Sequence, residues 1–147
     1  DRALMSLDHL RLERKFILSL KDGATFSADS DMLTDEARQQ IDGFLSDLDQ
    51  TEDMIFLVAG HTDNKGTAQH NYELGQRRAG SVARYLISRK KVDPLRVTTM
   101  SYGDSTPIAP NTTIAGRQKN RRIEILVYRD SIAVSSVSTT PVSRDTY

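Results

Sequence analysis

The feature that most limits how this chain can fold is an uninterrupted apolar run over residues 54–59, which ends at Gly60. An apolar run without alternation is typical of a β-strand that is covered on both faces, whereas a strand with one face in water alternates apolar and polar residues. We therefore expect this strand in the middle of a sheet, with the residues after Gly60 in a loop at its end.

That loop and the helix after it carry two charged residues that could form a site. The loop, residues 60–66, places Asp63 just beyond the central strand. A helix is predicted over 71–90 with Asn71 as its N-cap, and at about 100° per residue Arg78 falls in the middle of its apolar face. That face comprises Leu74, Gly75, Val82, Tyr85 and Leu86, while Arg77 and Arg84 fall on the opposite, polar side.

The inward direction predicted for Arg78 requires a partner. A guanidinium stays charged in proteins, so one that is directed toward a packed face has to be paired. Two interpretations are open. Arg78 either makes a structural salt bridge with a carboxylate at the edge of the core, or it shares a pocket with Asp63 in which the two side chains bind the opposite charges of a zwitterion.

Further strands and one further helix complete the predicted fold. Strands are expected over 15–20, 96–102 and 122–128, and a helix begins after Thr34, an N-cap residue followed by two acidic residues. Residues 104–116 are interrupted by prolines and predict a long loop with room for one helical turn. The order β-α-β-α-β-β predicts an α+β (α/β) two-layer sandwich, with a mixed four-stranded sheet and both helices packed on one face.

The two ends of the chain differ from this domain, which we place at residues 15–128. Residues 1–14 predict a short amphipathic helix or a linker, and residues 129–147, rich in serine and threonine, predict a disordered tail. Because the chain opens at Asp1, we expect a processed protein or an excised fragment. A leader, a membrane anchor or a barrel would then lie outside this sequence.

Composition argues against several classes of function. Twenty Lys and Arg balance twenty Asp and Glu, which is unlike a general nucleic-acid binder. There is no cysteine for a disulfide or a thiolate metal site, and no apolar run has the roughly 18 residues of a membrane span. His61, Asp63 and His70 lack the spacing of a zinc motif, and no nucleophile motif is present. We expect no metal, no cofactor and no enzymatic activity.

Five ordered motifs extend over most of the chain. They are Gly60-His61-Thr62-Asp63-Asn64, Asn71-x-x-Leu74-x-x-x-Arg78-Ala79, Ser101-Tyr102-Gly103-Asp104, Pro107-Ile108-Ala109-x-Asn111 and Gly116-Arg117-x-x-Asn120-Arg121-Arg122-Ile123-Glu124. Over roughly residues 15–128 the chain resembles the OmpA-like C-terminal peptidoglycan-binding domain. That family includes the tails of outer-membrane porins, the peptidoglycan-associated lipoprotein and flagellar stator subunits.

The resemblance implies a β-α-β-α-β-β fold and a ligand, the diaminopimelate of peptidoglycan stem peptides. It implies that Asp63 binds the ammonium at the side-chain end of diaminopimelate and that Arg78 clamps the carboxylate there with a forked pair of hydrogen bonds. Asn71 and backbone groups around Thr62 and residues 27–31 would line the pocket. The implied role is non-catalytic anchoring of an outer-membrane or envelope protein to the cell wall, in the periplasm of a Gram-negative bacterium.

Three features of the sequence need comment against that family. Ser27 follows Phe26 where an aspartate is common in the family. Gly75 stands where many members have serine, and close packing, the approach of the ligand or simple tolerance could each explain the glycine. The pair Arg121-Arg122 is either a second anion site or, as we favour, a support of the fold.

A different class of function is also open. The chain could be a structural or assembly module of an envelope or flagellar-stator complex that binds no wall ligand. Asp63 and Arg78 would then pair with each other, and the domain could form a homodimer through residues 1–14.

Overall fold

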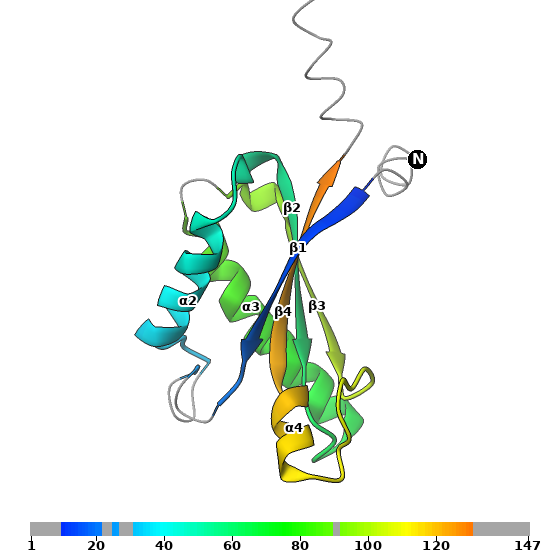
Figure 1. Ribbon diagram of the computed structural model, residues 1–147. Helices are drawn as coiled ribbons and strands as arrows, with labels where there is room; N and C mark the ends of the chain where they lie inside the picture. The colour runs from blue at the N-terminus through cyan, green and yellow to red at the C-terminus, as the bar shows by residue number, and fades with distance from the viewer. Residues whose placement is uncertain (1–9, 22–24, 27–30, 90–91, 131–147) are drawn as a thin grey trace, which may run out of the picture.

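The chain folds as strands alternating with helices around one sheet (Figure 1). The computed structural model describes residues 10–21, 25–26, 31–89 and 92–130 of the 147. Its elements are β1 (Leu10–Ser19), α2 (Asp35–Ser46), the 3₁₀ turn η1 (Thr51–Asp53), β2 (Met54–His61), α3 (Ala68–Ile87), the 3₁₀ turn η2 (Pro94–Arg96), β3 (Val97–Gly103), α4 (Ile114–Asn120) and β4 (Arg122–Asp130).

The four strands form one mixed sheet in the order β1-β4-β2-β3. β4 runs antiparallel to both β1 and β2, while β3 runs parallel to β2. Helix α3 is the crossover that two consecutive parallel strands require. β2 is an inner strand, as its apolar sequence predicted.

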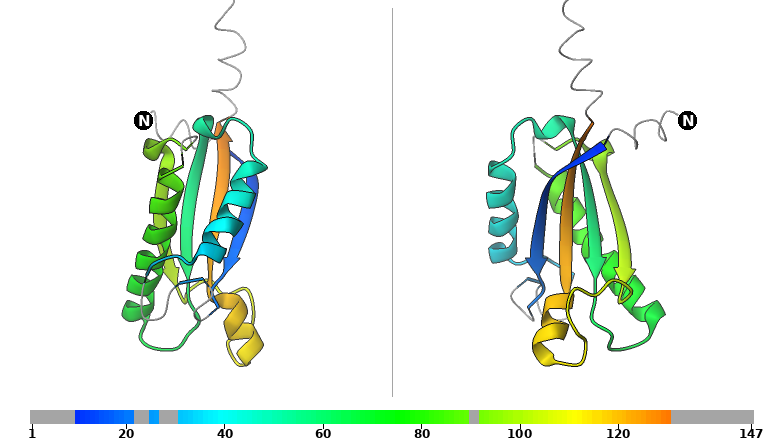
Figure 2. Two further views of the ribbon diagram at one scale, coloured as in Figure 1. Left: turned by 90° about the vertical axis from the view of Figure 1, so that its left-hand side faces the viewer. Right: turned by 45° about the vertical axis from the view of Figure 1, so that its right-hand side comes forward.

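Two layers make up the molecule. Helices α2 and α3 lie side by side on one face of the sheet, and α4 lies beyond the end at which β2 and β3 finish and β4 starts (Figures 1 and 2). The predicted fold class is confirmed. The further expectation that β2 is covered on both faces is wrong, because Ile55 and Leu57 are only partly buried on the face opposite α2 and α3.

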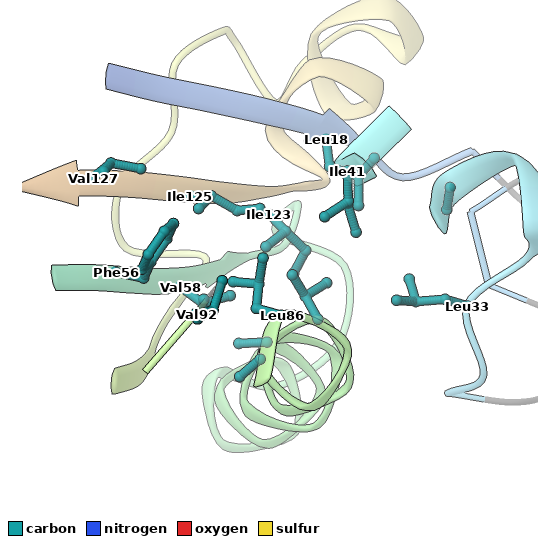
Figure 3. Close-up of a cluster of buried hydrophobic side chains, with 14 of the residues drawn as sticks. Leu18, Leu33, Ile41, Phe56, Val58, Leu86, Val92, Ile123, Ile125 and Val127 are labelled. Atoms are coloured by element: carbon teal, nitrogen blue, oxygen red, sulfur yellow. The ribbon is translucent and has the colours of Figure 1, made fainter. Parts of the chain in front are cut away.

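The hydrophobic core fills the space between the sheet and the two long helices (Figure 3). The inner strands β2 and β4 contribute every second residue over most of their length, because side chains alternate between the two faces of a sheet, whereas β3 adds only the partly buried Val97. Burial of this layer is the dominant stabilising term of such a fold. Among the fully buried members are Leu18, Ile41, Phe56, Val58, Val82, Leu86, Ile123, Ile125 and Val127.

Several predicted boundaries shift. β1 begins at Leu10, so residues 10–14 are strand and not the helix expected for residues 1–14; residues 1–9 lie outside the described part. The sequence indicated a helix here because Leu4, Leu7 and Leu10 have helical spacing and most of residues 11–14 are charged. In the structure the pairing of this segment with β4 contains a register shift between Leu12 and Arg14. β4 continues to Asp130, and the remaining residues of the expected tail also lie outside the described part.

Helix α3 packs against β2 at a point where two glycines meet. A Cβ added to Gly60 would lie 2.2 Å from the carbonyl oxygen of Gly75, and one added to Gly75 would lie 2.3 Å from Oγ of Ser101. Close packing is thus the reason for the glycine at position 75. The contact fixes how near the helix comes to the end of the sheet that carries the Asp63 loop.

We predict that Gly60→Ala destabilises the protein by about 3 kcal/mol or more, because the methyl group would meet the backbone of α3 and force the helix away from β2. Gly43→Ala is the matched control, since its Cβ would enter open space within α2, and it should stabilise by roughly 0.5–1 kcal/mol. Chemical denaturation measures both. Equal stabilities for the two variants would contradict the tight contact.

Candidate functional site

The candidate site lies at the end of the sheet where the loop after β2, the start of α3 and α4 come together (Figure 1). Asp63 follows β2 and is 7% exposed. Its Oδ1 accepts a hydrogen bond from the backbone N–H of Lys65 at 3.0 Å. A buried carboxylate is stable only when such donors and charges surround it.

Arg121 provides the charge that balances Asp63. Its Nη1 donates to Asp63 Oδ2 at 2.5 Å, and its Nη2 donates to Gln118 Oε1 at 2.8 Å. The Asp63 side chain is 9% exposed and that of Arg121 is 25% exposed, so the pair is largely shielded from water. The carboxylate of Asp63 is thus paired with Arg121, which differs from the Asp63–Arg78 pair that the assembly alternative expects.

Asn71 lies inside the first turns of α3 and is not its N-cap. Thr67 is the cap, and its Oγ1 accepts from the N–H of His70 at 3.1 Å. The Asn71 side chain is buried, and its Nδ2 donates to the backbone oxygen of Asp63 at 3.3 Å and to Asp104 Oδ2 at 3.2 Å. Asn71 therefore ties the Asp63 loop to the loop after β3.

Thr62 is also buried, and its groups are engaged within the protein. The backbone N–H of Thr62 donates to the Gly103 oxygen at 2.8 Å, and Oγ1 donates to the Asp63 oxygen at 2.9 Å. Its N–H is therefore engaged within the protein, and the lining of a pocket by backbone groups around Thr62 stays a prediction. Thr62 instead holds the Asp63 loop against the end of β3.

Arg78 is half-buried on α3, between the exposed Arg77 and the buried Ala79. Its guanidinium carbon lies over the ring of Phe26, 5.7 Å from the centroid, a cation–π arrangement. Phe26 is held in place by an isolated antiparallel bridge to Leu33. The predicted inward direction of Arg78 is thus observed, and residues 27–30 of the adjacent loop lie outside the described part.

His61 lies on the sheet face that α2 and α3 leave uncovered. Its ring stacks on Tyr102 with centroids 5.1 Å apart, and neither ring nitrogen has a hydrogen-bond partner. Burial lowers the pKa of His61 to about 4; the charges of Arg122 and Lys15 act in the same direction, and Glu124, whose Oε1 is 4.0 Å from Nε2, opposes them. Within the described residues, no group of three or more acidic or histidine side chains could hold a metal ion.

Arg122 supports the fold from the same face as His61. It is 1% exposed and donates from Nε to Glu124 Oε2 at 2.6 Å and from its terminal nitrogens to the oxygens of Asn120 and Thr106, both at 3.1 Å. Burial raises the pKa of Glu124, but the hydrogen bond and the charge of Arg122 outweigh it and hold that pKa below its usual value. The favoured structural role of the arginine pair is therefore observed for Arg122.

Two residues of this region were not singled out as site residues. The sequence assigned Arg121 a role in supporting the fold. Its contact with Asp63 depends on α4, where the sequence predicted a long loop with only one helical turn. Asn120 is fully buried; its Oδ1 accepts from the N–H groups of Ile108 and Ala109, and its Nδ2 donates to Ala109 O and Asn111 Oδ1. The signal that could have identified both residues is their place in the Asn120-Arg121-Arg122 triplet of the last motif.

A separate groove lies between α2 and α3, away from Asp63. One hollow in it has a volume of about 460 Å³ and is lined by Leu45, Leu48, Val92 and polar residues that include Asp42 and Arg89. The hydroxyl of Tyr85 on α3 donates a 2.7 Å hydrogen bond to Asp42 of α2. None of the residues that surround Asp63 lines this hollow.

Fold and site together define a two-layer α+β domain that presents a buried carboxylate and a half-buried guanidinium near the end of an inner strand. Comparison with known proteins agrees with the resemblance seen in the motifs. The chain belongs to the OmpA family, which matches residues 25–121.

Individual relatives support this membership. Outer membrane protein A of Bordetella avium is 40% identical over 100 residues, which cover 68% of this chain and 51% of that protein. The peptidoglycan-associated lipoprotein of Pseudomonas aeruginosa is 37% identical over 100 residues, covering 68% and 58%. The periplasmic domain of Helicobacter pylori MotB superposes with a TM-score of 0.62 at 28% identity, over 91% of this chain and 98% of that structure.

The chain spans little more than half the length of these two sequence relatives. In the part of the chain that the structure describes, none of the helices combines the length and the apolar character needed to cross a membrane.

We predict that stability falls as the pH drops from about 6.5 to about 4.5, because His61 takes up a proton readily when unfolded but only near pH 4 when folded. The unfolded state then binds more protons, so the free energy of unfolding should decrease by roughly 2–3 kcal/mol across this window. The loss due to Glu124 comes at lower pH, since its folded pKa is depressed.

The control is His61→Phe, which keeps a ring against Tyr102 and removes two buried unpaired nitrogens. Denaturant melts at several pH values should show the variant nearly insensitive between pH 6.5 and 4.5. The same slope in both proteins would assign the pH dependence to other groups.

Proposed function

We propose that this domain binds peptidoglycan without catalysis, through the zwitterionic end of diaminopimelate in the stem peptide, and so anchors an envelope protein to the cell wall. The observation that carries the proposal is the placement of two opposite charges. Asp63 follows the end of β2 and Arg78 projects from α3, and these two elements are in direct contact at Gly60 and Gly75. Helical side chains lean toward the helix N-terminus, which is the end where Asp63 lies.

The chemistry of the two groups matches that ligand. Asp63 uses two of the roughly four acceptor positions of a carboxylate, so others remain for the ammonium of a ligand. The planar guanidinium of Arg78 suits a carboxylate, to which it can donate two parallel hydrogen bonds. Diaminopimelate carries both groups on one carbon, whereas lysine at the same stem position lacks the carboxylate.

Asn71 and Thr62 take part by holding the Asp63 loop. Both donate to the backbone oxygen of Asp63, and neither side chain needs to contact the ligand directly. A ligand site gains affinity when its groups are held in the binding geometry in advance. Their proposed role is thus to position the carboxylate.

The names of the relatives support the cellular setting of the proposal. One is an outer membrane protein, one a peptidoglycan-associated lipoprotein and one a periplasmic domain. We place the domain in the periplasm, next to the outer membrane of a Gram-negative bacterium. No nucleic acid or cofactor enters the proposal, and His61, the histidine beside the loop, contacts Tyr102 on the uncovered face and not Asp63.

The test is a two-dimensional amide NMR titration with a stem peptide that contains diaminopimelate. We predict saturable shifts around residues 62–66 and 71–78, and a loss of affinity of about tenfold or more for both Asp63→Asn and Arg78→Gln, since each removes one ionic contact. Arg77→Gln is the control, because it removes the same charge from the exposed neighbour on α3.

Two results would contradict the proposal. Absence of shifts in a folded sample would favour the assembly function, and equal affinity losses for Arg77→Gln and Arg78→Gln would show only a general charge effect. Thermal melts accompany the titrations, because Asp63→Asn leaves Arg121 without its anionic partner and is expected to lower stability.

A further inference from the structure

We propose that Arg121 makes the site selective for a zwitterion over a simple ammonium. The inference rests on the proposed function, and it assigns a specificity role to a residue that supplies the counter-charge of Asp63 in the protein without ligand. Arg121 would act through its positive charge at the point where the ligand's ammonium has to enter.

The guanidinium of Arg121 is held in this position from several directions. Nη1 is bound to Asp63 Oδ2 and Nη2 to Gln118 Oε1. Gln118 is itself fixed, because its Nε2 donates to the Leu20 oxygen at 3.0 Å. The backbone of Arg121 donates to Arg117 O at 3.2 Å and accepts from Leu20 N at 3.0 Å, so both ends of the residue are anchored.

A fixed positive charge affects the two kinds of ligand differently. An ammonium that binds Asp63 enters within a few ångströms of Arg121, and the two like charges repel in this partly shielded place. The carboxylate of a zwitterion sits on the same carbon as the ammonium and is attracted by the same guanidinium. Repulsion and attraction largely cancel for the zwitterion, whereas a ligand with only an ammonium meets the repulsion alone.

Arg78 and Arg121 would therefore divide the work of recognition. Arg78 increases the affinity for a ligand that has a carboxylate, and Arg121 lowers the affinity for a ligand that lacks one. Specificity is a difference between two affinities, and proteins commonly produce it with a repulsive element as well as an attractive one. Removal of Arg121 should weaken the discrimination without abolishing binding.

Other charges near the site do not produce this effect. Lys65 contributes its backbone N–H to Asp63, and Asp104 reaches the loop through Asn71. Both remain in place for either ligand and in every variant compared, so their contribution cancels when affinity ratios are compared.

The experiment measures dissociation constants of two stem peptides that differ only at the third residue, diaminopimelate or lysine, by NMR titration. The proteins are the wild type, Arg121→Gln, Arg121→Lys and Arg96→Gln. Arg96 lies in η2, pairs with Asp93 and controls for the loss of one positive charge elsewhere. Thermal melts check folding, and Arg121→Met, which keeps an unbranched and uncharged side chain, replaces Arg121→Gln if that variant is unfolded.

We expect Arg121→Gln to bind the lysine peptide roughly tenfold more tightly than the wild type does, while its affinity for the diaminopimelate peptide changes by less than about threefold. Arg121→Lys and Arg96→Gln should keep the wild-type ratio, because both retain a positive charge beside Asp63.

Each other outcome overturns the inference. A selective wild type with an unchanged ratio in Arg121→Gln leaves the proposed function intact and removes the role of Arg121. Loss of diaminopimelate binding in Arg121→Gln, without a gain for lysine, makes Arg121 a support of Asp63 only. A folded wild type that binds neither peptide ends the proposed function together with the inference.

Discussion

The close approach of α3 to β2 at Gly60 and Gly75 is the constraint on which the rest of the site depends. At this point the backbones of a helix and a strand touch, with no side chain between them. The contact sets the height of α3 over the sheet, and with it the positions of Asn71 before Gly75 and of Arg78 after it. Asp63 follows this strand soon after Gly60. The same backbone contact therefore fixes the positions of both Asp63 and Arg78.

Neighbouring arginines point in different directions because of the local backbone geometry, and they have different contacts. On α3, about 100° separates Arg77 from Arg78, so one faces water while the other lies over Phe26. Where α4 passes into β4, Arg121 turns to Asp63 while Arg122 turns to Glu124 under the uncovered face. Of these four arginines, Arg77 is exposed and Arg122 forms a structural ion pair. Arg78 and Arg121 are the two cations near the candidate site.

Much of the fold could be predicted because its signals are local. The apolar run of β2 indicated an inner strand, and the stripe on α3 indicated the inward direction of Arg78, both of which the structure shows. Thr34 was predicted as an N-cap, and its Oγ1 accepts from Ala37 N.

The rest depends on contacts between distant residues, which no local pattern contains. The start of β1 was predicted five residues too late, because Leu4, Leu7 and Leu10 suggested a helix and most of residues 11–14 are charged. The ion pair of Arg121 with Asp63 joins residues that are far apart in sequence, and it requires α4, whose seven residues have little apolar periodicity. The N-cap was assigned to Asn71 because asparagine favours that position, yet Thr67 fills it and frees Asn71 to join two loops.

The central claim is that Asp63 and Arg78 bind the two charges of one amino-acid centre. A crystal structure of the domain with a bound diaminopimelate tripeptide tests it most directly. The account predicts the ligand ammonium within hydrogen-bond distance of the Asp63 carboxylate and the adjacent carboxylate on the guanidinium of Arg78. A peptide found instead in the groove between α2 and α3, with no contact to Asp63 or Arg78, would contradict the account.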